Sequence, residues 1–208
     1  MSLGHLIPRG YRPGSGLISP TGIFYLNIPK NASTYMTNLL LANEWTHSDV
    51  YDPKINECIV ILRDPVERWI SGFATYAASW LLGYGYGSDH FRDDYNELVQ
   101  RVIFDQLIFD DHTTEQVQFI YQLGTKDVTY FKLNYELGMN LESFLDCKLG
   151  LNNPVLSNKS EDNYDTKAIA SHMRFRIEQD PRLRALIIEK YKEDYDRIKC
   201  ANYYNEPR

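Results

Sequence analysis

The stretch that decides the fold is FYLNIPKNAST at positions 24–34, where a short apolar run ends at a proline and a lysine follows. Residues from Thr34 to about Asn43 have the spacing of a helix. A strand that passes through a tight turn into a helix leaves the first N–H groups of the helix unpaired at the turn. The Lys30 ammonium and these backbone N–H groups, at about Ala32 to Thr34, predict a site for a phosphate-like anion.

The same residues also suit a solvent-facing turn before an ordinary helix, and this alternative stays open from the stretch alone. The glycine-rich signature G-x-x-x-x-G-K-[ST] is absent, because no glycine occurs between Tyr25 and Thr34.

Apolar runs and helical spacing alternate along the rest of the chain. Runs at 58–62 and 128–131 are typical of buried strands. Helices are expected from Asp64 to the glycine-rich residues 83–87, and at 90–107, 113–123, 140–149 and from 180 onward. This alternation predicts an α/β fold in which helices cover both faces of a central parallel sheet, a three-layer α/β/α arrangement.

Length and composition fit one domain that spans residues 1–208, with residues 1–22 as an irregular lead-in. A net charge of −6 argues against a broad basic surface for nucleic acid. No apolar stretch reaches the roughly 20 residues of a membrane span. The three cysteines have no C-x-x-C spacing, which favours neither a zinc site nor a disulfide framework and suits a reducing compartment.

A second motif, RDPVERWIS at positions 63–71, follows the apolar run at 58–62. Arg63 stands at the predicted strand end, where a guanidinium can clamp a phosphate. On the following helix, Arg68 and Ser71 are expected on the face opposite the apolar stripe that includes Phe73. Arg63 and Ser71 could therefore converge on one anion. The alternative is a capped helix with a charged surface cluster.

The two motifs together resemble the cofactor signatures of sulfotransferases that use 3′-phosphoadenosine 5′-phosphosulfate (PAPS). The resemblance is to the carbohydrate sulfotransferases and their bacterial and viral relatives, and it runs from about residue 24 to 195. Residues 111–116 resemble that branch's Asp-x-His-Trp-x-Pro-Gln region, although the Trp and Pro are missing. Residues 191–195 resemble its Tyr-x-x-Asp-Tyr helix.

The resemblance implies a P-loop-like fold and a role for each motif. Residues 30–34 would cradle the 5′-phosphosulfate, and Lys30 would also stabilise charge on the bridging oxygen as the S–O bond breaks. Arg63 and Ser71 would hold the 3′-phosphate. Lys159 falls in a segment that matches a loop closing over the nucleotide in relatives. The alternative interpretation is that Lys159 is an ordinary solvated loop lysine.

Sulfuryl transfer also needs a base for the proton of the acceptor hydroxyl. In several sulfotransferases a Glu or His between the two cofactor motifs acts as this base, which makes Glu44 and His47 candidates here. His112 is the third candidate, favoured by its motif, while Glu57 is less suited because it adjoins the second strand. No metal-ligating cluster stands out in the sequence, and the family requires no metal.

The sequence thus predicts an enzyme that moves a sulfuryl group from PAPS to a hydroxyl acceptor, expected to be a carbohydrate. One alternative is a small-molecule kinase of P-loop type that uses ATP, although the missing glycines argue against it. Another is a non-catalytic nucleotide-binding module. The short chain without a membrane anchor favours a cytoplasmic protein of prokaryotic or viral origin.

Overall fold

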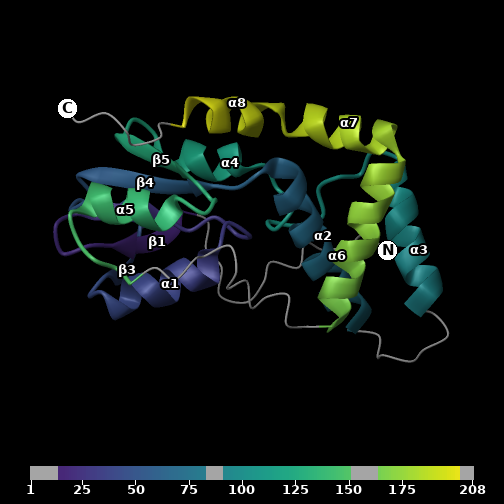
Figure 1. Ribbon diagram of the computed structural model, residues 1–208, viewed down its shortest axis with the longest axis horizontal. Coiled ribbons are helices and arrows are strands. Elements are labelled where there is room, and N and C mark those ends of the chain that lie inside the picture. Colours follow the sequence, from purple (N-terminus) through teal and green to yellow (C-terminus); the bar gives the residue numbers. More distant parts are fainter. Residues whose placement is uncertain (1–13, 83–90, 151–163, 202–208) are drawn as a thin grey trace. The chain divides into compact units, whose positions relative to one another are not determined.

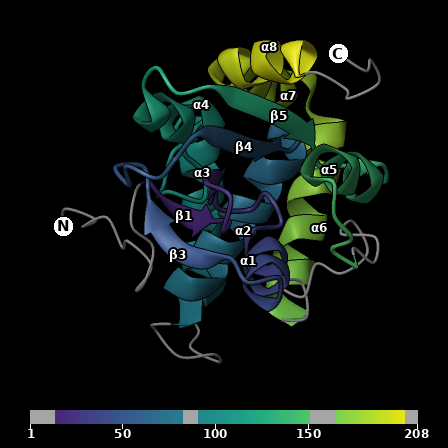
Figure 2. The ribbon, with the colours of Figure 1, turned by 90° about the vertical axis from the view of Figure 1, so that its left-hand side faces the viewer.

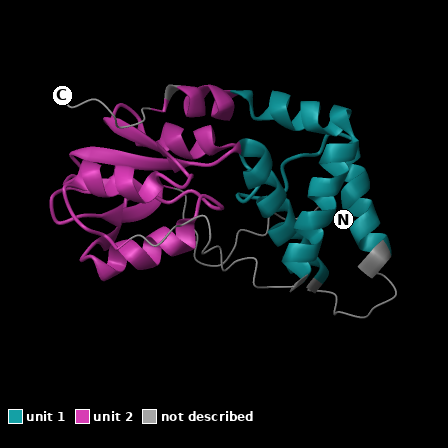
Figure 3. Cartoon of the chain, viewed as in Figure 1, with its two compact units in different colours: residues 1–7, 65–114, 159–192 teal, residues 8–64, 115–158, 193–208 magenta. Residues whose placement is uncertain are grey.

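The structure is a computed structural model that describes residues 14–82, 91–150 and 164–201 (Figure 1). The chain forms two compact units (Figure 3). The unit formed by residues 8–64, 115–158 and 193–208 contains the β-sheet and is called the sheet unit. The unit formed by residues 1–7, 65–114 and 159–192 is called the helical unit. Each unit is therefore assembled from separate stretches of the sequence.

The sheet has five strands in the order β3-β1-β2-β4-β5 (Figure 2). Their bounds are β1 Ser15–Ile18, β2 Ile23–Leu26, β3 Thr46–Asp49, β4 Glu57–Leu62 and β5 Val128–Lys132. Strands β2, β4 and β5 are parallel neighbours, whereas β1 pairs antiparallel with both β2 and β3. The prediction of an α/β fold is confirmed, but the sheet is mixed and only its β2-β4-β5 part is parallel.

Strand β1 corrects one expectation, and strand β3 was not predicted. Residues 1–22 were expected to be irregular, yet Ser15–Ile18 forms β1 between two other strands. The signal was weak, because only two of its four residues are large and apolar. Strand β3 has the sequence THSD without any large apolar residue, and none of its residues is buried. Its position comes from backbone pairing with β1, which periodicity does not report.

The two faces of the sheet bury separate apolar clusters. Alternate strand residues such as Ile59 and Val60 belong to different clusters, as the period of two in a strand requires. Helices α1 (Ser33–Ala42) and α5 (Leu137–Leu145) contribute to the Ile59 cluster. Helix α4 (Gln116–Ile120), the 3₁₀ turn η1 (Tyr121–Leu123) and the residue Ile198 of α8 (Lys192–Cys200) contribute to the Val60 cluster.

The helical unit is built around α2 (Pro65–Leu82), which begins at the proline that the sequence marks as a helix start. Helices α3 (Phe91–Ile103), α6 (Tyr164–Gln179) and α7 (Pro181–Lys190) complete it. The expected apolar stripe of α2 is confirmed, since Trp69 and Phe73 are fully buried in the core.

Three helical expectations need correction. Helix α6 was not predicted. The helix expected at 140–149 is α5, which begins and ends earlier, at Leu137–Leu145. The single final helix expected from Asp180 is two helices, because α7 ends before Tyr191 and α8 begins after it. None of the described helices combines the length and the apolarity that crossing a membrane requires.

Helix α2 approaches the chain at His112 so closely that only glycine fits at one position. A β-carbon on Gly72 would lie 2.2 Å from the His112 carbonyl oxygen, which is a backbone atom and cannot move aside alone. We therefore expect Gly72→Ala to lower the free energy of unfolding by about 1–3 kcal/mol, although alanine is the better helix former.

Urea unfolding measures this effect, with Ser79→Ala on an exposed position of the same helix as the control. The control is expected to stay within about 0.5 kcal/mol of the unaltered protein. Equal stabilities of the Gly72 and Ser79 variants would contradict the close approach.

Candidate functional site

The predicted anion turn joins β2 to α1 in the sheet unit. Lys30 and Ala32 both have left-handed backbone angles, with φ of 69° and 59°. Ala32 is the N-cap of α1, and its side chain makes no capping hydrogen bond. The first backbone bond of α1 runs from the Met36 N–H to the Ala32 carbonyl, at 2.9 Å. The N–H groups of Ser33 and Thr34 precede this bond, as an anion site at a helix start requires.

Arg63, from the second motif, directly follows β4 and is held beside this turn. Its Nη1 donates to the Lys30 carbonyl at 3.0 Å. Its backbone N–H donates to Gln116 Oε1, and its carbonyl accepts from Gln116 Nε2, each at 3.0 Å. Because β2 and β4 are parallel neighbours, both motifs leave the sheet at the same edge. The structure thus holds the Arg63 guanidinium against the backbone of Lys30, whereas the sequence analysis had expected Arg63 to converge with Ser71.

Asn31 has a different role from the expected one. Its side chain is only 1% exposed, and its Nδ2 donates to the Ile61 carbonyl at 2.7 Å and to Gln116 Oε1 at 2.6 Å. Its backbone N–H donates to the Ile28 carbonyl at 3.2 Å. These bonds engage all three N–H donors of an asparagine. The side chain of Asn31 therefore ties the turn to strand β4 and to the first residue of helix α4.

Gln116 and Asp194 complete this arrangement, although the sequence analysis named neither as a site residue. The Asp194 side chain is fully buried and accepts from the backbone N–H groups of Gln116 and Val117, each at 2.9 Å. Both residues lie in segments that resemble the sulfotransferase family, and that was their only signal. An aspartate inside the charged run at 192–196 gives no sign of burial.

The rest of the second motif lies on α2 in the helical unit. Ser71 is 7% exposed. Arg68, expected on the face opposite the apolar stripe, is only 1% exposed, and its guanidinium donates to the backbone carbonyls of Thr114 and Asp111. A guanidinium can be buried in this way where carbonyl oxygens receive its donors. Arg68 therefore fixes the chain at 111–114. Lys159 lies outside the described residues.

The three candidate bases lie in different surroundings. Glu44 follows the last turn of α1, so the length of this ten-residue helix, roughly 15 Å, separates it from the anion turn. His47 is exposed on the edge strand β3. Both belong to the sheet unit, whereas His112 is a partly buried residue of the helical unit.

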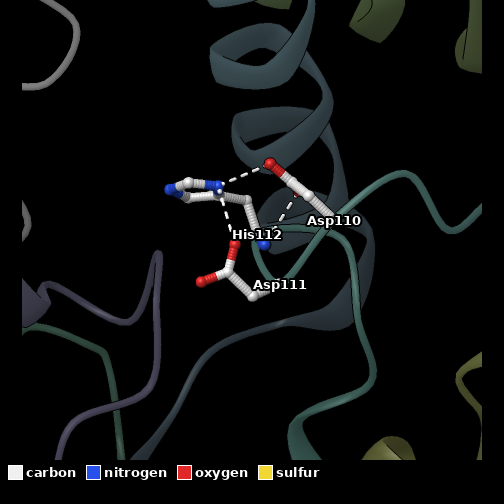
Figure 4. Close-up of side chains that lie close together, drawn as sticks. All are labelled: Asp110, Asp111 and His112. Carbon is white, nitrogen blue, oxygen red and sulfur yellow. Dashed lines mark hydrogen bonds and ion pairs between the residues drawn. The ribbon is translucent and has the colours of Figure 1, made fainter. Parts of the chain in front are cut away.

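His112 is held by two neighbouring carboxylates (Figure 4). Its Nδ1 lies 2.8 Å from Asp110 Oδ2 and 3.4 Å from Asp111 Oδ1. Its backbone N–H donates to Asp110 Oδ1 at 2.9 Å. These contacts fix the ring and direct Nδ1 to the carboxylates, which makes Nε2 the nitrogen suited to proton transfer. In the Asp-x-His spacing, the matching aspartate is Asp110, and the sequence analysis did not single it out.

The same three side chains are also the described residues with the geometry of a metal site. Their ligand atoms lie within 4.8 Å of one another. Three consecutive residues have no recognisable metal-ligand spacing, so these residues could not be identified as a metal site from the sequence. A carboxylate–imidazole group of this kind suits either a divalent cation or an oriented histidine base.

Asp111 differs from Asp110 in how it is solvated. Asp110 accepts a hydrogen bond from the His112 backbone N–H, whereas the Asp111 oxygens are out of contact with solvent and, apart from the 3.4 Å contact with His112 Nδ1, have no hydrogen-bond partner among the described residues. Burial raises the pKa of Asp111, and the neighbouring His112 and Arg68 lower it by less. The charged form of Asp111 is therefore unfavourable in the folded protein.

Comparisons of the chain with models of known protein families, with curated proteins and with solved structures found no match. The function of the chain has to be argued from its own residues. Of the predicted site residues, Lys30, Ser33, Thr34 and Arg63 lie around one turn of the sheet unit.

The left-handed angle of Ala32 generates the first prediction from the site. A left-handed conformation costs a residue with a β-carbon roughly 1–2 kcal/mol, and glycine avoids this cost. We expect Ala32→Gly to raise the free energy of unfolding by about 0.5–1 kcal/mol. Ala42→Gly, in the last turn of the same helix, should lower it by a similar amount. Urea unfolding of both variants checks these opposite signs, and a loss in both would contradict the prediction.

The different surroundings of Asp110 and Asp111 lead to a second prediction, which concerns the pH dependence of stability. The folded-state pKa of Asp111 lies above its unfolded value, so its charge reduces stability as pH rises from about 3.9 through the folded pKa. Asp111→Asn should therefore raise the free energy of unfolding near neutral pH, and the gain should vanish below about pH 3.9.

Asp110→Asn serves as the paired variant, because it replaces one of the two oxygens that contact His112 by an NH₂ donor and should lower stability by about 1–3 kcal/mol. Urea unfolding across the pH range measures both. A stability loss in the Asp111 variant at neutral pH would be inconsistent with this account.

Proposed function

We propose that the chain is a PAPS-dependent sulfotransferase that moves a sulfuryl group to a hydroxyl of a carbohydrate acceptor. The observation that carries the proposal is the bond from Arg63 Nη1 to the Lys30 carbonyl. It joins the two motifs that resemble the cofactor signatures of this family. An ordinary capped turn would not require a second cation, Arg63, to be held beside Lys30.

The surroundings of the turn support an anionic nucleotide as the ligand. In parallel sheets, ligands bind at the carboxyl ends of the strands, and here both motifs follow such ends. The N–H groups of Ser33 and Thr34 and the Lys30 ammonium would receive the 5′-phosphosulfate. A P-loop-like, three-layer arrangement is part of the proposal, supported by the apolar clusters on both sheet faces.

The reaction requires these residues to position the cofactor and to stabilise the developing charge. PAPS supplies a sulfuryl group whose bond to the bridging oxygen breaks as the acceptor oxygen bonds to sulfur, leaving 3′,5′-adenosine bisphosphate. Lys30 would stabilise the negative charge that develops on the bridging oxygen. Arg63, and Ser71 by its place in the motif, would hold the 3′-phosphate.

A base must accept the proton of the acceptor hydroxyl, and we assign this role to His112. Asp110 fixes its ring at 2.8 Å, so the imidazole is already oriented for proton transfer. Glu44 is the weaker candidate, because it lies at the opposite end of α1 from the anion turn.

Calorimetry with 3′,5′-adenosine bisphosphate and with adenosine 5′-monophosphate tests the proposal. Lys30→Ala should lower the affinity for both ligands by about tenfold or more, since each ligand loses a charged partner. Arg63→Ala should weaken the bisphosphate more than the monophosphate, because its partner is the 3′-phosphate. Lys54→Ala and Arg184→Ala alter exposed cations elsewhere and should leave both affinities unchanged.

The outcomes separate the competing functions. A larger thermal shift with ATP and magnesium than with the bisphosphate would favour a kinase. Bisphosphate binding without sulfuryl transfer to any carbohydrate tested would favour a non-catalytic module. Absence of bisphosphate binding, or binding that neither variant weakens, would overturn the proposal.

A further inference from the structure

The side-chain amide of Gln116 joins the two segments that carry the anion-binding cations. Its Oε1 accepts from Asn31 Nδ2 at 2.6 Å and from the Arg63 N–H at 3.0 Å. Its Nε2 donates to the Arg63 carbonyl at 3.0 Å. The amide therefore binds the backbone of Arg63 through both its donor and its acceptor, as a neighbouring strand would. Gln116 is completely buried, so solvent offers no substitute partners.

Asp194 reinforces the direction in which this amide faces. Its Oδ2 accepts from the Gln116 backbone N–H at 2.9 Å and lies 3.4 Å from Gln116 Nε2. A carboxylate accepts hydrogen bonds and cannot donate them, so it attracts the NH₂ end of the amide and disfavours the oxygen end. A reversed amide would face the donors of Asn31 and Arg63 with another donor. The buried carboxylate therefore favours the same amide direction that the Arg63 backbone requires.

We propose that Asp194 and Gln116 are positioning residues for the anion-binding turn. They act without touching the ligand, through Asn31 on one side and the Arg63 backbone on the other. The inference rests on the proposed function in so far as the ligand is a nucleotide, and it assigns part of that site to α8, near the end of the chain. Small displacements of positioned groups cost large factors in binding and rate, so the network should be visible in affinity.

The test compares Asp194→Asn with Asp196→Asn, which makes the same change at an exposed position of the same helix. Calorimetry with 3′,5′-adenosine bisphosphate should give a dissociation constant about tenfold higher for the Asp194 variant and an unchanged one for the Asp196 variant. In the ligand-free proteins, the ¹H–¹⁵N resonances of Ser33 and Thr34 should shift only in the Asp194 variant. A purely structural role would lower the melting temperature without moving the resonances of the folded state.

Gln116→Met provides a second variant that retains the bonds from Asp194 to the α4 backbone, with exposed Gln118→Met as its control. It should shift the same two amide resonances and weaken the bisphosphate by a similar factor. Melting temperatures that fall while the Ser33 and Thr34 resonances and the bisphosphate affinity stay unchanged would overturn the inference. If the unaltered protein does not bind the bisphosphate, the proposed function fails, and the ligand-free resonances still decide whether Asp194 and Gln116 position the turn.

Discussion

The hydrogen bonds of the buried Gln116 amide are the interaction on which the candidate site of the sheet unit depends. A buried amide that loses its partners costs roughly 1–3 kcal/mol for each group left unpaired. The segments around Asn31, Arg63 and Gln116 can therefore meet in only one register. This requirement explains how the turn keeps left-handed angles at Lys30 and Ala32, which are not glycine. Such conformations persist where the surrounding structure over-determines them.

The parts of the fold that the sequence predicts are those with a strong local signal. Strand β4 has five buried residues in a row, and α2 starts at the proline that suits a first helical position. Strand β3 could not be predicted, because its polar sequence becomes a strand through pairing with β1. The break between α7 and α8 falls at Tyr191, which was not predicted either. The Tyr191 hydroxyl donates to the Thr113 carbonyl, a partner that no periodicity identifies.

The residues of the candidate site likewise fall into those with a local sequence signal and those without one. Lys30 and Arg63 could be found because each follows an apolar run with a recognisable motif. The roles of Asn31 and Gln116 could not, since their hydrogen bond joins residues separated by 85 positions. The Asp194 bond to the Gln116 backbone spans 78 positions. A buried polar residue is identified by its partner, and the partner is known only once the fold brings the two together.

Within the described residues, the chain passes from one unit to the other at 64/65, 114/115 and 192/193. These crossings fall inside the three segments 63–71, 111–116 and 191–195, which all resemble the sulfotransferase family. The backbone at residues 63–64 and 111–115 lies outside regular helices and sheets, so its polar groups need side-chain partners.

The side chains at the crossings supply those partners within each unit. In the helical unit, Arg68 donates to the Thr114 carbonyl and Tyr191 to the Thr113 carbonyl. In the sheet unit, Gln116 binds the Arg63 backbone, and Asp194 accepts from the Gln116 backbone. The same three segments therefore bind one another on both sides of the crossings. This shared demand for particular polar side chains gives a physical reason why motif residues so far apart in the sequence occur together in one chain.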